Sequence, residues 1–218
     1  MTDIRLRHDL INTALALGRL GLNKGTAGNV SVRYQDGYLI TPSGVAAEQL
    51  CPADIVFMDF DGFVEGRRAP SSEWRFHYDI LHSRPELGAV IHTHAPYCTT
   101  LAVMGEGIPA FHYMIAVAGG ADIRCAPYAT FGTQDLCDGA VKAMEGRKAC
   151  LLAQHGMIAA GETLAKALKL TVEVEDLAQV YWQARQIGHP PILDDAEMAR
   201  VLEKFKTYGT PQSAENKD

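Results

Sequence analysis

Two histidines separated by one residue end an apolar run in the chain. The stretch "AVIHTHAPYC" (89–98) contains His92 and His94, and residues two apart in a strand share one face of a sheet. A third histidine, His155, ends the apolar run "LLAQHGM". Three neutral imidazoles can hold Zn²⁺ and leave one position open for water or substrate. The alternative is that they are ordinary histidines at strand ends, because the sequence does not place His155 beside the other two.

A carboxylate follows two serines in "PSSEWRFH" (70–77). Glu73, expected in the first turn of a helix, could act as a general base beside a metal. It could equally be an ordinary helix start, because the helix dipole favours a negative charge there. The other histidines are assigned to surface or packing roles: His8, His77, His82, His112 and His189.

Three short stretches are rich in small residues and hydrogen-bond donors. They are "GTAGNVSVR" (25–33), "TPSG" (41–44) and the serines before Glu73. A glycine-rich loop before a strand can direct several N–H groups at an anion, although it can also be only a tight turn. The nucleotide-binding patterns GxxxxGK[ST] and GxGxxG are absent.

The lysines argue against one class of aldolase. A Schiff-base enzyme needs a lysine with a lowered pKa, usually a buried one, and no lysine of this chain lies inside an apolar strand. If the reaction stabilises a carbanion, a metal is the better candidate.

Hydrophobic spacing and turn residues predict the elements that position these groups. Helices are expected at 3–20, 70–85, 96–105, 162–187 and 194–205, and strands in 22–34, 37–44, 54–62, 87–94 and 149–161. Asp36-Gly37 should form a hairpin turn. Asp194, with Glu197 three residues later, should cap the last helix. Hairpins come early and helices lie between and after them, which predicts an α/β fold with a mixed, mostly antiparallel sheet.

Composition limits the class of protein. The 218 residues carry a net charge of −6 spread along the chain, and the five cysteines form no CxxC motif. We expect a cytoplasmic enzyme with no nucleic-acid or membrane partner, because a basic patch, a signal sequence and a membrane-spanning run are lacking. Residues 1–208 are expected to form a single domain, and the polar tail 209–218 to be disordered.

Several blocks, taken in order, resemble the class II aldolase and adducin family typified by L-fuculose-1-phosphate aldolase. The blocks are "RLGLNKGTAGNVSVRYQDGYLITPSG", "PSSEWRFH", "HTHA", "HYMIAVAGG", "CAPYATFGT", "QHGMIA" and "EKFKTYG". They run from about Arg19 to Tyr208 and so cover nearly the whole chain. The resemblance implies a single class II aldolase-like domain, with helices on both sides of the sheet, assembled as a four-fold homotetramer with active sites at the subunit interfaces.

The resemblance also implies roles for individual residues. His92, His94 and His155 would bind one catalytic Zn²⁺ per subunit, with Glu73 as the acid/base and as a further ligand in the resting site. The substrate phosphate would be held by Gly28, Asn29, Ser43, Gly44, Ser71 and Ser72, with Thr26 close by. Tyr113 would reach in from a neighbouring subunit as a proton donor, and Phe131, Phe205 and Tyr208 would lie near the aldehyde end.

The implied reaction is cleavage of a ketose 1-phosphate between C3 and C4, with zinc stabilising the enediolate of dihydroxyacetone phosphate. L-Fuculose 1-phosphate, which yields lactaldehyde, is placed first, and 5-deoxyribulose 1-phosphate or 5-(methylthio)ribulose 1-phosphate second. L-Ribulose-5-phosphate 4-epimerases are less similar because they tend to carry aspartate at Glu73. Methylthioribulose-1-phosphate dehydratases lack the "PSSEWRFH" block, and adducin-like modules lack zinc.

Overall fold

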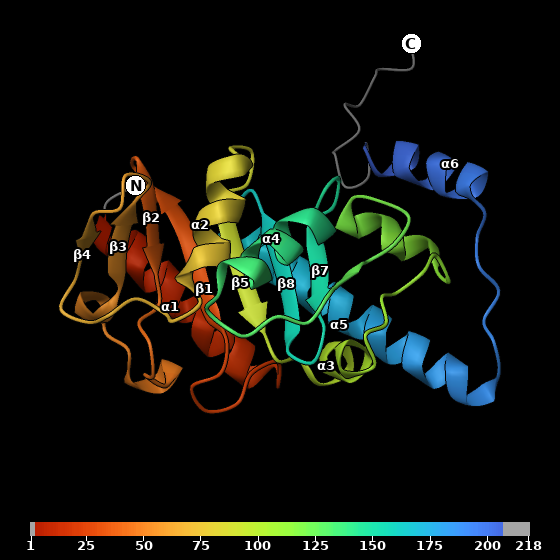
Figure 1. The fold of residues 1–218 in the computed structure, drawn as a ribbon, viewed down its shortest axis with the longest axis horizontal. Helices are drawn as coiled ribbons and strands as arrows, with labels where there is room; N and C mark the ends of the chain where they lie inside the picture. The colour runs from red at the N-terminus through yellow and green to blue at the C-terminus, as the bar shows by residue number, and fades with distance from the viewer. Residues whose placement is uncertain (1–2, 207–218) are drawn as a thin grey trace, which may run out of the picture.

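The computed structural model describes residues 3–206, and its centre is one sheet of eight strands (Figure 1). The strand order is β4-β3-β2-β1-β5-β8-β7-β6. Every pair in this sheet is antiparallel except β6 with β7. The strands are β1 (Asn29–Tyr34), β2 (Gly37–Ile40), β3 (Val56–Asp59), β4 (Val64–Glu65), β5 (Ala89–Thr93), β6 (Cys125–Ala126), β7 (Ala149–Leu152) and β8 (Gly156–Gly161).

Helices cover both faces of this sheet. In Figure 1, α2 and α4 lie in front of the sheet, and α1, α3 and α5 lie behind it. The helices are α1 (Asp3–Arg19), α2 (Trp74–Ser83), α3 (Pro96–Val103), α4 (Gln134–Ala143), α5 (Leu164–Ile187) and α6 (Asp195–Phe205). Short 3₁₀ helices are η1 (Ala47–Gln49), η2 (Pro52–Asp54) and η3 (Tyr113–Ala118). The predicted α/β class, with a mixed and mostly antiparallel sheet between helices, is confirmed.

Strand β1 shows how the sequence builds two cores. Val30 and Val32 belong to the apolar cluster shared with α1, α3 and α5. Asn29 and Ser31 alternate with them and face the side of α2. That second face has its own apolar cluster, which includes Phe76 of α2. A polar site can therefore form on the α2 face while the valines anchor the same strand from behind.

The late strand predicted at 149–161 is two strands in the structure. A turn at residues 153–155 separates β7 from β8, and Gln154 adopts a left-handed backbone with φ 56°. The prediction was wrong here because "AQH" contains neither Gly nor Pro, the residues that usually mark a tight turn. Helix α4 and the short strands β4 and β6 were not predicted.

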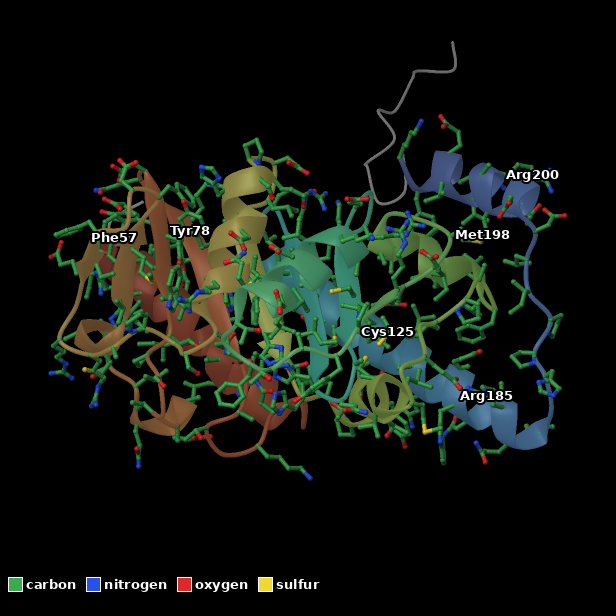
Figure 2. The ribbon with its side chains drawn as sticks, in the orientation of Figure 1. Phe57, Tyr78, Cys125, Arg185, Met198 and Arg200 are labelled. Carbon is green, nitrogen blue, oxygen red and sulfur yellow. The ribbon has the colours of Figure 1, made fainter. Side chains whose placement is uncertain are left out.

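The predicted cap of the last helix is confirmed. The Asp194 side chain accepts a hydrogen bond from the Glu197 N–H at 2.7 Å. Helix α6 packs on η3, beyond the edge of the sheet where α5 also projects (Figure 1). Arg185, near the end of α5 in Figure 2, pairs with Glu106.

Across residues 3–206, no helix is both long and apolar enough to span a bilayer. Tyr208 and the predicted tail 209–218 lie outside the described residues.

Candidate active site

The register of β5 fixes the first histidine. His92 pairs with Asn29 of β1 on one side and with Ile158 of β8 on the other. Its side chain is completely buried. His94 lies one residue past the end of β5 and is exposed to solvent. The alternation expected for H-x-H therefore brings both rings to one end of the strand, one buried and one at the surface.

The third histidine comes from the turn between β7 and β8, not from the end of a strand as predicted. Its backbone N–H donates to the Leu152 carbonyl at 3.0 Å, which closes the turn. Gly156 follows at a position where a side chain would not fit, because a Cβ there would lie 2.4 Å from the Thr93 carbonyl oxygen. This close approach of β8 to β5 brings His155 beside the other two rings, and the ligand atoms of His92, His94 and His155 lie within 4.8 Å of one another.

The hydrogen bond of His92 determines which nitrogen faces the cluster. Nδ1 lies 2.9 Å from the Met157 carbonyl oxygen, so Nδ1 carries the proton and donates it. Nε2 is left bare, and it lies 3.1 Å from Nε2 of His94. Burial lowers the pKa of His92 to about 4, which keeps the ring neutral near pH 7. A neutral imidazole oriented by a backbone carbonyl is the usual form of a metal-binding histidine.

Glu73 lies at the N-cap of α2, one residue before the first turn in which it was predicted. Its N–H donates to the Ser71 hydroxyl at 3.3 Å. Its carboxylate Oε1 is 3.1 Å from His155 Nε2, and Oε2 is 3.4 Å from His92 Nε2. Burial alone would raise the pKa of this carboxyl, but His155, His92 and the Asn29 amide together lower it to about 2. Glu73 is therefore an ionised carboxylate in direct reach of the histidines.

These donors fit a divalent cation. Glu73 Oε1 is buried and has no hydrogen-bond partner among the described residues, although it lies 3.1 Å from His155 Nε2. Tetrahedral zinc with bonds of about 2.0–2.1 Å sets its ligands about 3.3 Å apart. The separations of 3.1 and 3.4 Å between Glu73 and the two histidines match that spacing. A cation between these atoms would satisfy the unpartnered oxygen.

A cleft of about 380 Å³ opens beside the cluster. It brings together eight of the residues predicted to bind substrate: Thr26, Gly28, Asn29, Ser43, Gly44, Ser71, Ser72 and Phe131. Among the described residues that line it, none is Lys or Arg. An anion bound there would be held by N–H and hydroxyl groups. Their individual roles stay predictions.

Two predicted residues are not brought to the cleft within one chain. Tyr113 opens η3 and is 52% exposed, and Phe205 ends α6. Both belong to the region where α6 packs on η3, and neither lines the cleft. The prediction that Tyr113 acts from a neighbouring subunit is consistent with this placement and stays a prediction.

Several residues of the site were not predicted from the sequence. Tyr128 and Gln154 line the cleft, and His77, assigned above to surface or packing, is completely buried behind it. The spacing of four residues between Glu73 and His77 places both on one side of α2. That spacing was the available signal, but a lone helical histidine is common in ordinary packing.

Comparison with known proteins agrees with this geometry. Residues 8–182 match the family described as Class II Aldolase and Adducin N-terminal domain. The chain is 65% identical to a 5-methylthioribulose-1-phosphate/5-deoxyribulose-1-phosphate aldolase of Rhodospirillum rubrum, covering 94% of this chain and 93% of that one. It is 55% identical to an L-fuculose phosphate aldolase of Escherichia coli, covering 94% and 96%. A solved structure of an L-fuculose 1-phosphate aldolase superposes with a TM-score of 0.91 at 45% identity, covering 94% and 98%.

Proposed function

Because the chain belongs to the class II aldolase and adducin family, we propose that it is a zinc-dependent aldehyde-lyase. It cleaves a ketose 1-phosphate into dihydroxyacetone phosphate and a short aldehyde. The observation that carries this proposal is the three-histidine cluster with the unpartnered Glu73 oxygen, directly beside a donor-lined cleft. An adducin-like module with no chemistry to perform would not need this arrangement.

His92, His94 and His155 would hold one zinc ion, with Glu73 as a further ligand in the absence of substrate. When bound, the ion supplies a Lewis acid that stabilises negative charge on the substrate oxygens. Neutral imidazoles leave the full double charge of the ion available for this task.

The phosphate end of the substrate would lie against the loops that contain Gly28, Ser43 and Gly44. Gly28 and Gly44 have positive φ angles of 75° and 70°, and turns of this kind can direct successive backbone N–H groups at an anion. A Cβ on Gly28 would lie 2.6 Å from the His92 carbonyl oxygen, so the loop packs directly on the metal-binding strand. A phosphate bound there would be held at a fixed distance from the reacting carbons, and such positioning lowers the barrier.

Glu73 would move the proton in the reaction. Its carboxylate is ionised and buried at the mouth of the cleft, so it can remove a carbon-bound proton from dihydroxyacetone phosphate in the direction of condensation. In cleavage it returns that proton to the same carbon and completes the product.

The aldehyde end favours an apolar substituent. Tyr128 and Phe131 line the cleft with side chains 61% and 66% exposed, and aromatic rings make favourable contacts with a methyl group or a thioether sulfur. The 65% identity to the Rhodospirillum rubrum enzyme supports 5-deoxyribulose 1-phosphate and 5-(methylthio)ribulose 1-phosphate as the first candidates. L-Fuculose 1-phosphate becomes the second candidate, which reverses the order given by the sequence alone.

The assembly and location follow from the same proposal. A homotetramer with sites at its interfaces would let Tyr113 of one subunit donate a proton to the aldehyde oxygen in the next. All five cysteines are unpaired, which fits a reducing cytoplasm.

A side-by-side assay tests the proposed function. The zinc-loaded enzyme should cleave all three ketose 1-phosphates, with the deoxy and methylthio pentuloses fastest, and should not interconvert ribulose 5-phosphate and its epimer. A chelator should abolish cleavage and added Zn²⁺ should restore it. Cleavage that the chelator does not affect would exclude the metal mechanism. If fuculose 1-phosphate were cleaved fastest, it would again be the first candidate substrate, as the sequence alone predicted.

A further inference from the structure

A chain of buried hydrogen bonds leads away from the proton-moving carboxylate into the core. Asn29 Nδ2 donates to Glu73 Oε2 at 2.9 Å. Asn29 Oδ1 lies 2.5 Å from His77 Nε2, and His77 Nδ1 lies 2.7 Å from the Ser31 hydroxyl oxygen. All four residues are at most 7% exposed. This series of hydrogen bonds joins the N-terminal end of α2 to strand β1.

The direction of each hydrogen bond is determined by the first. An ionised carboxylate only accepts, so Asn29 must present its NH₂ group to Glu73. The carbonyl oxygen of the same amide then faces His77, which must donate from Nε2. The remaining nitrogen, Nδ1, is bare and accepts from the Ser31 hydroxyl. Only one tautomer of His77 satisfies every atom of this chain.

Strand β1 and helix α2 hold this series of hydrogen bonds in place. Asn29 and Ser31 are two apart on β1 and so share the face toward α2, while Glu73 and His77 are four apart along the start of α2. Burial lowers the pKa of His77 to about 3, so the ring stays neutral near pH 7 and keeps one donor and one acceptor. His77 is not among the residues that line the cleft, and its two ring nitrogens bond to Asn29 and Ser31.

We propose that His77 is a positioning residue, which orients the Asn29 amide so that it always donates to Glu73. This proposal rests on the proposed function, because it assigns the group that aligns the proton-moving carboxylate. Without the Nε2 donor, the Asn29 amide is free to turn over and point its carbonyl oxygen at the carboxylate. That orientation repels Glu73 and leaves buried polar atoms unpaired, and such atoms are costly.

The effect should fall on proton transfer more than on substrate binding. Of the residues predicted to bind the phosphate, Asn29 alone belongs to this series of hydrogen bonds, through its side-chain amide. Gly28, Ser43, Gly44, Ser71 and Ser72 lie in the cleft outside the series. A misaligned Glu73 would therefore lower kcat, with a smaller effect on KM.

A matched pair of variants separates this role from simple packing. The His77→Gln side chain can place an amide N–H near the position of Nε2, so it keeps the donor to Asn29. The His77→Asn side chain is shorter and reaches only toward Ser31, so it loses that donor. Ile80→Ala, a buried residue of the same helix, controls for loss of stability alone.

The assay is exchange of a carbon-bound proton of dihydroxyacetone phosphate with deuterium from D₂O, catalysed by the zinc-loaded enzyme. This half-reaction needs Glu73 but no aldehyde. We expect His77→Asn to lower kcat for exchange about 10- to 100-fold with KM changed less than about threefold. His77→Gln should recover most of the loss, and Ile80→Ala should exchange like the wild type per zinc-loaded subunit.

A double-mutant cycle with Asn29→Ala decides whether His77 acts through Asn29. The double variant His77→Asn/Asn29→Ala should be no slower than Asn29→Ala alone, because the group that His77 orients is already gone. Additive losses, or equal losses for the Gln and Asn substitutions, would overturn the proposal. Absence of exchange in the wild-type enzyme would instead contradict the proposed function.

Discussion

Single atoms decide what each side chain of the site can do. Nδ1 of His92 is occupied by the Met157 carbonyl, which leaves Nε2 for a metal. In Glu73, Oε2 accepts from Asn29, and Oε1 has no hydrogen bond to any residue from 3 to 206. The carboxylate therefore has one oxygen held by the protein and one directed to the metal-binding cluster, an arrangement suited to a group that must first hold still and then exchange a proton.

Glu73→Gln should keep the fold and the zinc but lose about 10²- to 10⁴-fold in turnover, the usual contribution of a general acid/base. Glutamine has the same size, and its carbonyl oxygen can still accept from Asn29, but it cannot take up a proton. Zinc content and kcat should be measured on the same sample. Turnover equal to the wild type would remove Glu73 from the acid/base role.

The buried His77 should make the metal-free protein sensitive to mild acid. Its pKa is about 3 when folded and about 6.5 when unfolded. Its neighbours are Ser31 and Asn29, with Glu73 and His92 beyond them, and protonation would break the hydrogen bond that Nδ1 accepts. The folded state therefore resists a proton that the unfolded state accepts, so the free energy of unfolding should fall as pH drops below about 6.5.

The slope due to one such group is at most about 1.4 kcal/mol per pH unit. Urea unfolding of the chelator-treated protein at pH 7, 6 and 5 should show a shallower decline for His77→Gln than for the wild type. Parallel declines would contradict this prediction. Carboxylates contribute mainly below this range, since their unfolded pKa values are near 4.

At the scale of elements, one helix secures the start of another beside the site. Helix α3 begins two residues after His94, and its first backbone N–H groups donate hydrogen bonds to the carboxylate of Glu175 in α5. Oε1 of Glu175 accepts from Tyr97 N–H at 2.8 Å, and Oε2 accepts from Cys98 N–H at 2.9 Å. Pro96 at the first helical position has no N–H to satisfy. A buried carboxylate thus replaces the usual local capping residue.

Glu175→Gln should lower the free energy of unfolding by about 1–3 kcal/mol, because one buried N–H loses its acceptor. Urea denaturation of the zinc-loaded protein measures this change. Asp176→Asn, the exposed neighbour on the same helix, is the matched control and should change stability by less than about 0.5 kcal/mol. Similar losses in the two variants would mean that the cap is not important for stability.

At the scale of the whole molecule, the proposed metal connects distant parts of the chain. Its ligands come from the start of α2, the end of β5 and the turn between β7 and β8. A ligand that binds only the folded state stabilises it by about 2.7 kcal/mol when present at 100 times its Kd. The metal would therefore stabilise the fold in addition to its role in chemistry.

Removal of zinc should lower the Tm by about 5–10 °C, from the usual 2–4 °C per kcal/mol in proteins of this size. Differential scanning calorimetry with chelator, and again after zinc is restored, measures the shift. His155→Ala should abolish the zinc-dependent part of the shift. His189→Ala should retain it, because His189 is an exposed histidine two residues past the end of α5. A wild-type Tm that does not change when zinc is removed would argue against a bound ion.

Residue spacing in the sequence predicted most of the helices, the hairpins and the faces of the strands. The helix at 3–20 and the placement of His92 and His94 on one side depend on neighbours within a few residues. The hairpin between β1 and β2 was predicted as well, but its turn residues are Gln35 and Asp36 rather than Asp36 and Gly37, because Gly37 already pairs with Tyr34. The turn at 153–155 was missed because it relies on a left-handed Gln154 held by closure of the hairpin. Helix α4 was missed as well, although its Thr133 cap hydroxyl accepts from Leu136 N–H.

The role inferred for His77 could not come from local patterns. His77 and Asn29 are 48 residues apart in the chain, and only the packing of α2 on β1 brings them together. The donor-rich loops, in contrast, were recognisable as a set because family resemblance groups them. The role of Tyr113 stays a prediction that depends on a neighbouring subunit.

The pairing of Asn29 with His92 across β1 and β5 has a consequence for redesign of the enzyme. Asn29 follows Gly28 of the proposed phosphate loop, and His92 is a proposed metal ligand, so one strand pairing holds the two parts of the proposed site together. Tyr128 and Phe131 lie instead on the loop before α4, outside every strand pair of the described sheet. Under the proposed function, the groups that would break the bond lie on or beside the paired strands, whereas those that would contact the aldehyde lie on this loop. Substitutions intended to change the aldehyde should therefore be made on the loop.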